Sequence, residues 1–259
     1  MKYLLLFLLI PFTLQAQESK ETQLPEKYLT FTLTAGPRTL DTQTGDIYAS
    51  FIDDSYLPDT FTTYTPLKDS YTRAGIQIGV HWGKYKGISH SLVLDFAQSE
   101  NKTNHFAYSI GYSIPVPMGD HHLIIRPNIA GILGNTKLYL GEIQNTSSYL
   151  QINDLLYYEE YIELNLTATN ALYAPQLDLY YKLHQRYAIT LQIGYDIGTQ
   201  ISKPKLQFIQ PSDYDEQTPT TKPINTDNPL IRFNDQPLTK LPYQLNGPRI
   251  SLGASLYLR

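Results

Sequence analysis

The chain has 259 residues, a formal net charge of -4 at pH 7 and only 17% charged residues. This acidic balance argues against a nucleic-acid-binding surface, and the lack of cysteine excludes disulfides, thiolate metal sites and lipid-modified cysteines. The 22 tyrosines are unusual, and they suit surfaces that are partly apolar and partly hydrated.

The N-terminal residues MKYLLLFLLIPFTLQAQ have the layout of a secretory signal peptide. A lysine precedes an apolar run of about ten residues, which is followed by the small residue Ala16. This run is shorter than the about 20 residues that a membrane-spanning helix needs. We therefore predict a signal peptide at 1–16, a polar periplasmic leader at 17–26 and one folded domain at 27–259.

Beyond the leader, apolar residues recur at every second position in eight segments separated by turn residues, a pattern typical of β-strands. In the segment 187–198, YAITLQIGYDIG, one face carries Tyr, Ile and Leu, and the other carries Ala, Thr, Gln, Gly and Asp. The eight predicted strands are 27–36, 73–83, 88–98, 105–114, 122–134, 171–183, 187–198 and 248–259.

The lengths of the connections form a second pattern. Long connections at 37–72, 135–170 and 199–247 follow the first, fifth and seventh segments, whereas the second, fourth and sixth segments are followed by short turns. Long loops therefore gather at one end, as in outer-membrane barrels. The sequence predicts an all-β fold, namely an eight-stranded antiparallel up-and-down transmembrane β-barrel with long extracellular loops.

The composition of the less apolar face distinguishes this barrel from a soluble β-sandwich. A solvent-exposed face normally carries many Lys and Glu residues, but this face carries Gly, Ala, Ser, Thr and Gln with isolated charges. Small and polar residues suit the crowded interior of an eight-stranded barrel. We therefore expect the apolar face to contact lipid.

The isolated charges on the inward face should pair with one another or with nearby amides, because an unpaired buried charge is costly. We predict a structural network in the barrel interior, although a polar pore or proton path is an alternative role. Its predicted members are Asp95, Arg126, Asp178, Asp196, Arg249, Gln77, Gln176 and Gln192.

No catalytic, cofactor-binding or metal-ligating residues are predicted. His90 and Ser91 are the nearest match to a hydrolase pair, but adjacent strand residues point to opposite faces. His105, His121 and His122 have no matching serine and acid at useful spacing. The acidic stretches 41–46 and 212–216 lack the ligand spacing of a calcium loop, so we interpret them as solvated turns.

Two parts of the long loops are candidate contact surfaces. The segment 153–164, NDLLYYEEYIEL, is either a short amphipathic helix or a strand extension. Its Tyr157, Tyr158 and Tyr161 suit a contact surface, and a self-packed loop explains them equally well. The polar stretch 203–245 either folds over the barrel mouth or docks on a partner.

The export signal, the eight segments, PQLDLYYKL and the terminal ISLGASLYLR together resemble small OmpA- and OmpX-like outer-membrane barrels of the Bacteroidetes, including the PorT type. The resemblance implies a non-enzymatic structural or accessory subunit of an outer-membrane complex in a Gram-negative bacterium. Its implied partners are outer-membrane lipid, lipopolysaccharide and other outer-membrane proteins. A lipid A-modifying hydrolase or acyltransferase and a narrow channel are the alternatives.

Overall fold

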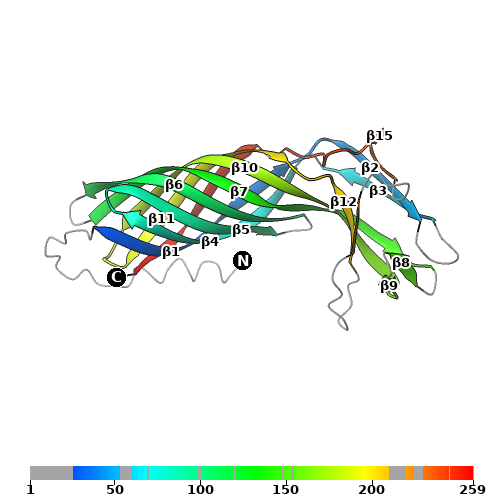
Figure 1. Cartoon of the computed structure of the whole chain (residues 1–259), viewed down its shortest axis with the longest axis horizontal. Helices are drawn as coiled ribbons and strands as arrows, with labels where there is room; N and C mark the ends of the chain where they lie inside the picture. Colours follow the sequence, from blue (N-terminus) through cyan, green and yellow to red (C-terminus); the bar gives the residue numbers. More distant parts are fainter. Residues whose placement is uncertain are drawn as a thin grey trace.

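A computed structural model shows an elongated all-β molecule (Figure 1). The structure describes residues 26–52, 60–68, 70–98, 101–118, 121–146, 149–152, 155–209, 220–223, 230–244 and 246–258. The predicted signal peptide, the leader up to residue 25 and the stretch 212–216 lie outside these residues. In the described part of the chain, no helix has the length and apolarity needed to span a membrane.

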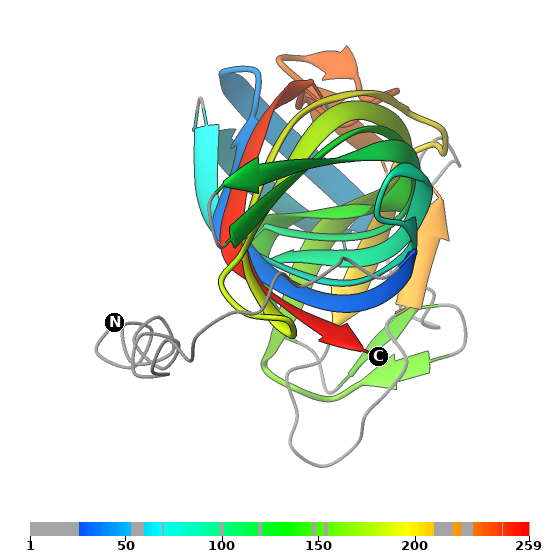
Figure 2. The same cartoon turned by 90° about the vertical axis from the view of Figure 1, so that its left-hand side faces the viewer.

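Eight antiparallel strands form a closed ring, which is seen end-on in Figure 2. Each strand pairs with the next in the series, and the last pairs with the first through the register Phe31↔Leu256. In ring order the strands are β1 (Lys27–Asp41), β4 (Ser70–Lys84), β5 (Gly87–Gln98), β6 (Lys102–Met118), β7 (His121–Gln144), β10 (Tyr161–Lys182), β11 (Tyr187–Gln200) and β16 (Gly247–Leu258).

Each predicted strand segment overlaps one ring strand in its described residues, and several ring strands are longer than predicted. The segment 122–134 lies within the 24 residues of β7, and 171–183 covers the second half of β10. β7 and β10 form a long hairpin that projects beyond the other strands, and their pairing extends from Lys182↔His122 to Tyr161↔Gln144. A register shift near Leu164, opposite Gly141 with its φ of 112°, marks a bulge in this extension.

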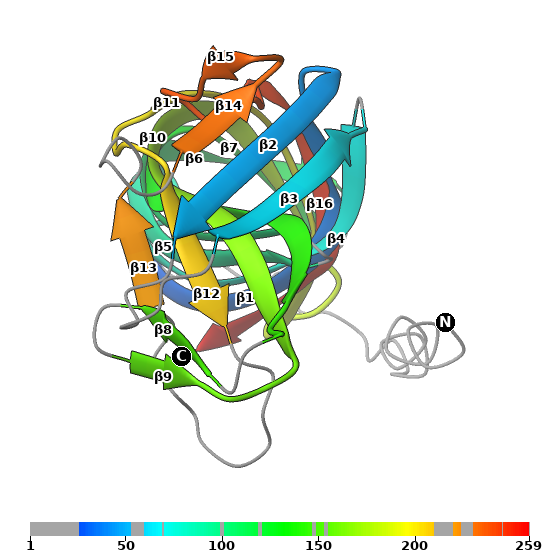
Figure 3. The same ribbon diagram turned by 90° about the vertical axis from the view of Figure 1, so that its right-hand side faces the viewer.

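The long connections are not simple loops, which corrects the prediction for 37–72, 135–170 and 199–247. They contain strands that gather at one end of the ring (Figures 1 and 3). We call this end the head, which also includes the projecting ends of β7 and β10. Its strands are β2 (Gly45–Ile52), β3 (Thr60–Leu67), β8 (Leu150–Ile152), β9 (Leu155–Tyr157), β12 (Lys205–Ile209), β13 (Thr220–Pro223), β14 (Leu230–Phe233) and β15 (Gln236–Pro237).

A four-stranded sheet with the order β15-β14-β2-β3 forms one wall of the head. The tight turn between β14 and β15 holds Asn234 and Asp235 at φ values of 47° and 62°. Asn and Asp tolerate this left-handed conformation better than most residues, which allows a two-residue hairpin. The register Ile231↔Ala49 then joins parts of the chain that are far apart in sequence.

The head has a conventional apolar core. Inward-facing side chains of the projecting strands, such as Leu138 and Leu164, are fully buried there. They pack against Ile47 from β2 and Phe208 from β12. Burial of this apolar surface stabilises the head in the way that it stabilises a water-soluble domain.

The ring has the opposite distribution of polarity. On β1, Thr30, Thr32 and Thr34 are buried, whereas Phe31 and Leu33 between them are 46% and 53% exposed. The same alternation recurs around the ring. It places large apolar side chains outside and mostly polar or small side chains inside, apart from a small buried apolar cluster around Ile132 and Leu172. A protein folded in water normally does the reverse.

Candidate functional site in the ring interior

Arg126 is the centre of the first polar cluster inside the ring. Its side chain is fully buried on β7, and Nη1 donates to Asp178 Oδ2 on β10 at 2.8 Å. Nε donates to Ser89 Oγ at 2.8 Å, and Nη2 donates to Ser109 Oγ at 3.0 Å. Asn128 also donates to Asp178 Oδ2, at 3.0 Å, so this one carboxylate oxygen accepts from both Arg126 and Asn128.

A second cluster lies nearer the head and contains two arginines. Arg38 Nε and Arg249 Nη1 lie 3.3 and 3.5 Å from Asp95 Oδ2, and Gln77 donates to the same oxygen at 2.9 Å. Arg249 Nη2 also lies 3.5 Å from Asp196 Oδ1. The predicted charges therefore divide into two clusters, one around Asp178 and one around Asp95.

Arg38 was not among the predicted network residues, because the predicted first strand ended at residue 36. In the structure β1 continues to Asp41, and Arg38 occupies the next inward position after Gly36. Its Nη2 donates to Ser251 Oγ at 3.0 Å. Continuing the two-residue alternation past Pro37 was the sequence signal that could have identified it.

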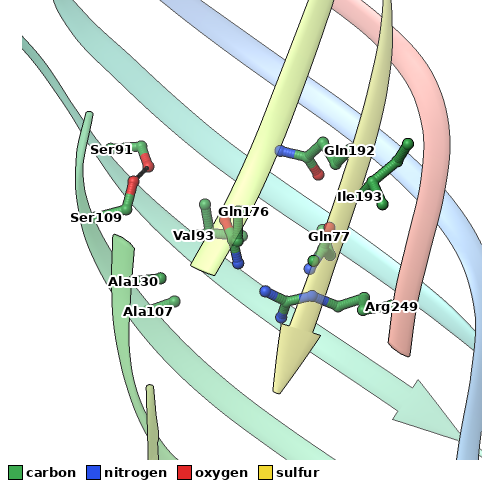
Figure 4. A pocket seen from close by; sticks show the side chains of 11 residues that line it. Gln77, Ser91, Val93, Ala107, Ser109, Ala130, Gln176, Gln192, Ile193 and Arg249 are labelled. Atoms are coloured by element: carbon green, nitrogen blue, oxygen red, sulfur yellow. Dashed lines mark hydrogen bonds between the residues drawn. The ribbon is translucent and has the colours of Figure 1, made fainter. Parts of the chain in front are cut away.

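The predicted glutamines line a small cavity between the two clusters (Figure 4). Thr34 Oγ1 lies 3.1 Å from the side-chain oxygens of both Gln77 and Gln192, and Gln176 contributes to the cavity wall. The cavity has a volume of about 20 Å³, and a second cavity beside Arg38 has a volume of about 60 Å³. These volumes suit individual water molecules, since one water needs at least about 10 to 15 Å³.

At the ring end opposite the head, tyrosines fill the interior. Tyr28, Tyr85, Tyr180 and Tyr257 belong to one buried cluster, and rings of Tyr85 and Tyr257 stack with centroids 5.9 Å apart. Lys182 Nζ donates to Tyr85 Oη at 2.9 Å and lies 4.4 Å from the centre of the Tyr257 ring. A hydrogen bond and cation-π contacts thus stabilise this buried ammonium group.

The sequence analysis did not identify this tyrosine cluster, although Tyr180 and Tyr257 alternate with apolar residues in the segments 171–183 and 248–259. Lys182 is the next inward residue after Tyr180 on β10, so the same alternation places it in the interior. Tyr180 Oη lies 3.1 Å from His81 Nδ1, which links the cluster to the wall formed by β4. The convergence of these side chains depends on the pairing of distant strands.

The residues considered for hydrolysis do not meet. His90 faces the outside of the ring, whereas Ser91 faces the interior and lies 2.6 Å from Ser109 Oγ. His105 lies on β6, while His121 and His122 begin β7 at the opposite end of the ring from the head. Among the described residues, no three His, Asp or Glu side chains gather as a group that could hold a metal ion.

The predicted contact surface of Tyr157, Tyr158 and Tyr161 needs one correction. Tyr157 is only 1% exposed and packs in the core of the head, whereas Tyr158 and Tyr161 are 62% and 46% exposed. The segment forms the end of β9 and the start of β10, so strand alternation turns Tyr157 away from its exposed neighbour. Of the two predicted conformations of 153–164, a short helix or a strand extension, the described residues adopt the strand extension.

The projecting hairpin also carries an ion pair whose strength should depend on pH. Lys137 Nζ lies 2.7 Å from Glu163 Oε1, and Asn165 donates to the same oxygen at 2.8 Å. Burial alone would raise the pKa of Glu163, but these hydrogen bonds outweigh it and hold the pKa below its ordinary value of 4.5. The ion pair therefore stabilises the head above about pH 4.5, and this contribution disappears as the pH falls through the lowered pKa.

We expect Lys137→Met to raise the pKa of Glu163, so that acid loosening of the hairpin begins at a higher pH. A carboxylate NMR titration would measure the pKa, and limited proteolysis between pH 6 and pH 3 would follow the hairpin. Lys203→Met, which changes an exposed lysine of the head, is the matched control. An unchanged Glu163 titration in Lys137→Met would contradict the expectation.

The interior therefore contains hydrogen-bonded ion pairs, a cluster of tyrosines and water-sized cavities, all held by a closed ring with an apolar exterior. This arrangement can stabilise the ring against collapse and hold individual waters. No protein-family model and no curated protein matches this chain.

Proposed function

We propose that the chain is an integral outer-membrane β-barrel that acts as a non-enzymatic structural or accessory subunit of an outer-membrane complex. In this proposal the ring spans the membrane and the head lies on the extracellular side. The tyrosine cluster then lies at the periplasmic end, because outer-membrane barrels have short periplasmic turns and longer extracellular loops.

The observation that carries the proposal is a reversal of polarity along single strands. On β7 the charged and polar inward side chains, Arg126 and Asn128, lie in the ring, whereas Leu138 and Leu140 are inward in the head; the smaller apolar cluster around Ile132 lies between them. The outward side chains change in the opposite sense, and exposed Leu133 is followed by Lys137, which is paired with an acid. Such a reversal is expected where one strand passes from lipid into water.

The extent of the apolar exterior agrees with a membrane span. Outward side chains are apolar or aromatic from Leu29 to Pro37 on β1 and from Ala171 to Tyr181 on β10. A tilted strand needs about 9 to 11 residues to cross the hydrocarbon core. Ring closure also supplies every strand with neighbours on both sides, which lipid requires because it offers no hydrogen bonds to an open strand edge.

The filled interior supports a structural role over a conducting one. Arg126 and Asp178 occupy the middle of the ring, and the cluster around Tyr257 and Lys182 occupies the end opposite the head. Small barrels are usually filled by side chains in this way. The head instead offers exposed aromatic side chains, including Tyr158 and Tyr161, as a surface for another outer-membrane protein.

Purification of the tagged chain from a Gram-negative host tests this function. A tag near Gln23 would follow the predicted signal peptide. We expect the protein in the outer-membrane fraction, and we expect that only detergent extracts it. A stoichiometric companion protein should be recovered with it, and the double variant Tyr158→Ser with Tyr161→Ser should reduce the recovery of that companion. A folded, monodisperse product in buffer without detergent would overturn the barrel, whereas repeated isolation without a companion would overturn the subunit role.

A further inference from the structure

Three aromatic rings lie nearly parallel on the outer face of the ring, across three neighbouring strands. The Trp82 ring on β4 and the His90 ring on β5 have centroids 5.7 Å apart and planes 20° apart. The His90 and Tyr108 rings are 6.1 Å and 22° apart. His90 Nδ1 also lies 2.8 Å from Tyr108 Oη, so a hydrogen bond fixes the stack.

His90 is a polar residue among apolar neighbours. Ile88 and Leu92, the outward residues on either side of it along β5, are 61% and 39% exposed. If this face contacts lipid, as proposed above, an imidazole there needs a polar partner. Tyr108 engages Nδ1, and Nε2 of this partly buried side chain is available to a ligand.

Exposed lysines lie close to this stack, at the ring end opposite the head. Trp82 pairs with Leu29 on β1, and the next outward row toward that end is Lys27↔Lys84. Because a strand rises about 3.3 Å per residue, Lys84 lies about 7 Å beyond Trp82. Lys86 follows in the turn, and both Lys84 and Lys86 are exposed.

The described residues at this end of the ring carry predominantly positive charge. Lys27, Lys84 and Lys86 are joined there by Arg186 in the turn after β10. Among the described residues of this end, Glu26 is the acidic one, and its carboxylate lies 3.9 Å from Lys84 Nζ with both side chains largely exposed. One surface ion pair of this kind contributes little, so the described residues of this end keep an excess of positive charge.

We propose that Trp82, His90 and Tyr108, together with Lys84 and Lys86, bind the headgroup of an anionic glycerophospholipid. The lysines would contact the phosphate, His90 Nε2 would contact the polar glycerol region, and the acyl chains would lie along the apolar outer face. A depth of about 7 Å between lysine and aromatic rows fits the passage from headgroup to acyl chain. The inference rests on the proposed membrane-spanning ring.

Trp82 is the sole tryptophan of the sequence, so its fluorescence reports directly on this site. The full mature chain would be reconstituted in phosphatidylcholine vesicles containing a fixed fraction of phosphatidylglycerol. Bromine, which quenches tryptophan fluorescence, would be placed on the acyl chains of one lipid or the other. We expect phosphatidylglycerol to be enriched about fivefold beside Trp82 for each lysine that contacts it.

Lys84→Gln with Lys86→Gln should remove this enrichment, whereas Lys203→Gln with Lys240→Gln, a matched change of exposed head lysines, should preserve it. His90→Phe, which keeps the aromatic stack, should lower the enrichment without moving Trp82 out of reach of the bromines. Enrichment that survives the Lys84 and Lys86 changes would overturn the proposal.

The failure of this inference is distinguishable from the failure of the proposed function. Equal quenching by both brominated lipids would overturn the headgroup site while supporting a membrane-spanning ring. No quenching by either lipid would show that Trp82 faces no acyl chain, and would overturn both. Displacement of the quencher by lipid A but not by unlabelled phosphatidylglycerol would overturn the glycerophospholipid assignment.

Discussion

Arg126→Leu should lower the free energy of unfolding of the ring by about 3 to 5 kcal/mol. Arg126 is fully buried, and it supplies the 2.8 Å ion pair to Asp178 together with hydrogen bonds to Ser89 and Ser109. Removing the guanidinium group leaves Asp178 buried without its cation, which is more costly than losing a surface ion pair. Equilibrium urea unfolding in lipid vesicles, followed by the fluorescence of Trp82, would measure the change.

The double variant Arg126→Leu with Asp178→Leu separates the cost of a lone buried charge from the net value of the pair. Replacing both members of a buried ion pair with apolar residues is often neutral or stabilising. We therefore expect the double variant to recover most of the lost stability. If Arg126→Leu alone unfolds at the same urea concentration as the unaltered protein, the ion pair does not stabilise the ring.

Ile78→Arg should destabilise the protein in a lipid bilayer by about 2 to 4 kcal/mol. Ile78 lies on the outer face of β4, midway along its apolar rows, and is 51% exposed. On a water-facing surface such a substitution would change stability by no more than about 0.5 kcal/mol. The large effect is expected because an arginine at the middle of the hydrocarbon layer loses its hydration.

Thr72→Arg is the matched control, since Thr72 lies on the same face of the same strand but nearer the head, where it pairs with Thr39. It should leave the urea midpoint nearly unchanged. The two variants would be unfolded with urea in the same vesicles. The folded and unfolded fractions would be read from gel bands, which are identified by their shift on boiling. Equal, small effects of both substitutions would show that water covers the outer face at Ile78.

The sequence specified much of the ring because strand alternation is a local property. Each predicted segment contained enough consecutive positions to separate a large apolar face from a small polar one, as in 187–198. The clustering of long connections at one end was also readable from their lengths. The strands of the head could not be predicted from the sequence, because strands such as β14 and β15 are short and lack sustained alternation.

The polarity reversal also limited the prediction. In the head the inward residues of β7 are the large apolar Leu138 and Leu140, and the outward residues are more polar. The alternation therefore continues with the apolar face on the other side, and the predicted strand ended at residue 134. The same change hid Arg38, the inward residue that precedes buried Leu40 on β1. A strand predicted from one apolar and one polar face is predicted to end where its surroundings change, even when the strand itself continues.

The sequence alone determined which residues alternate on each strand and that charged residues share the less apolar face. Only the tertiary structure decided that Asp95 meets Arg38 and Arg249 while Asp178 meets Arg126, because ring closure and register set these contacts between strands distant in sequence. The burial of Tyr157 and the convergence of Lys182 with Tyr257 were decided in the same way. Alternation places a side chain on a face, but the pairing of whole strands determines what it contacts.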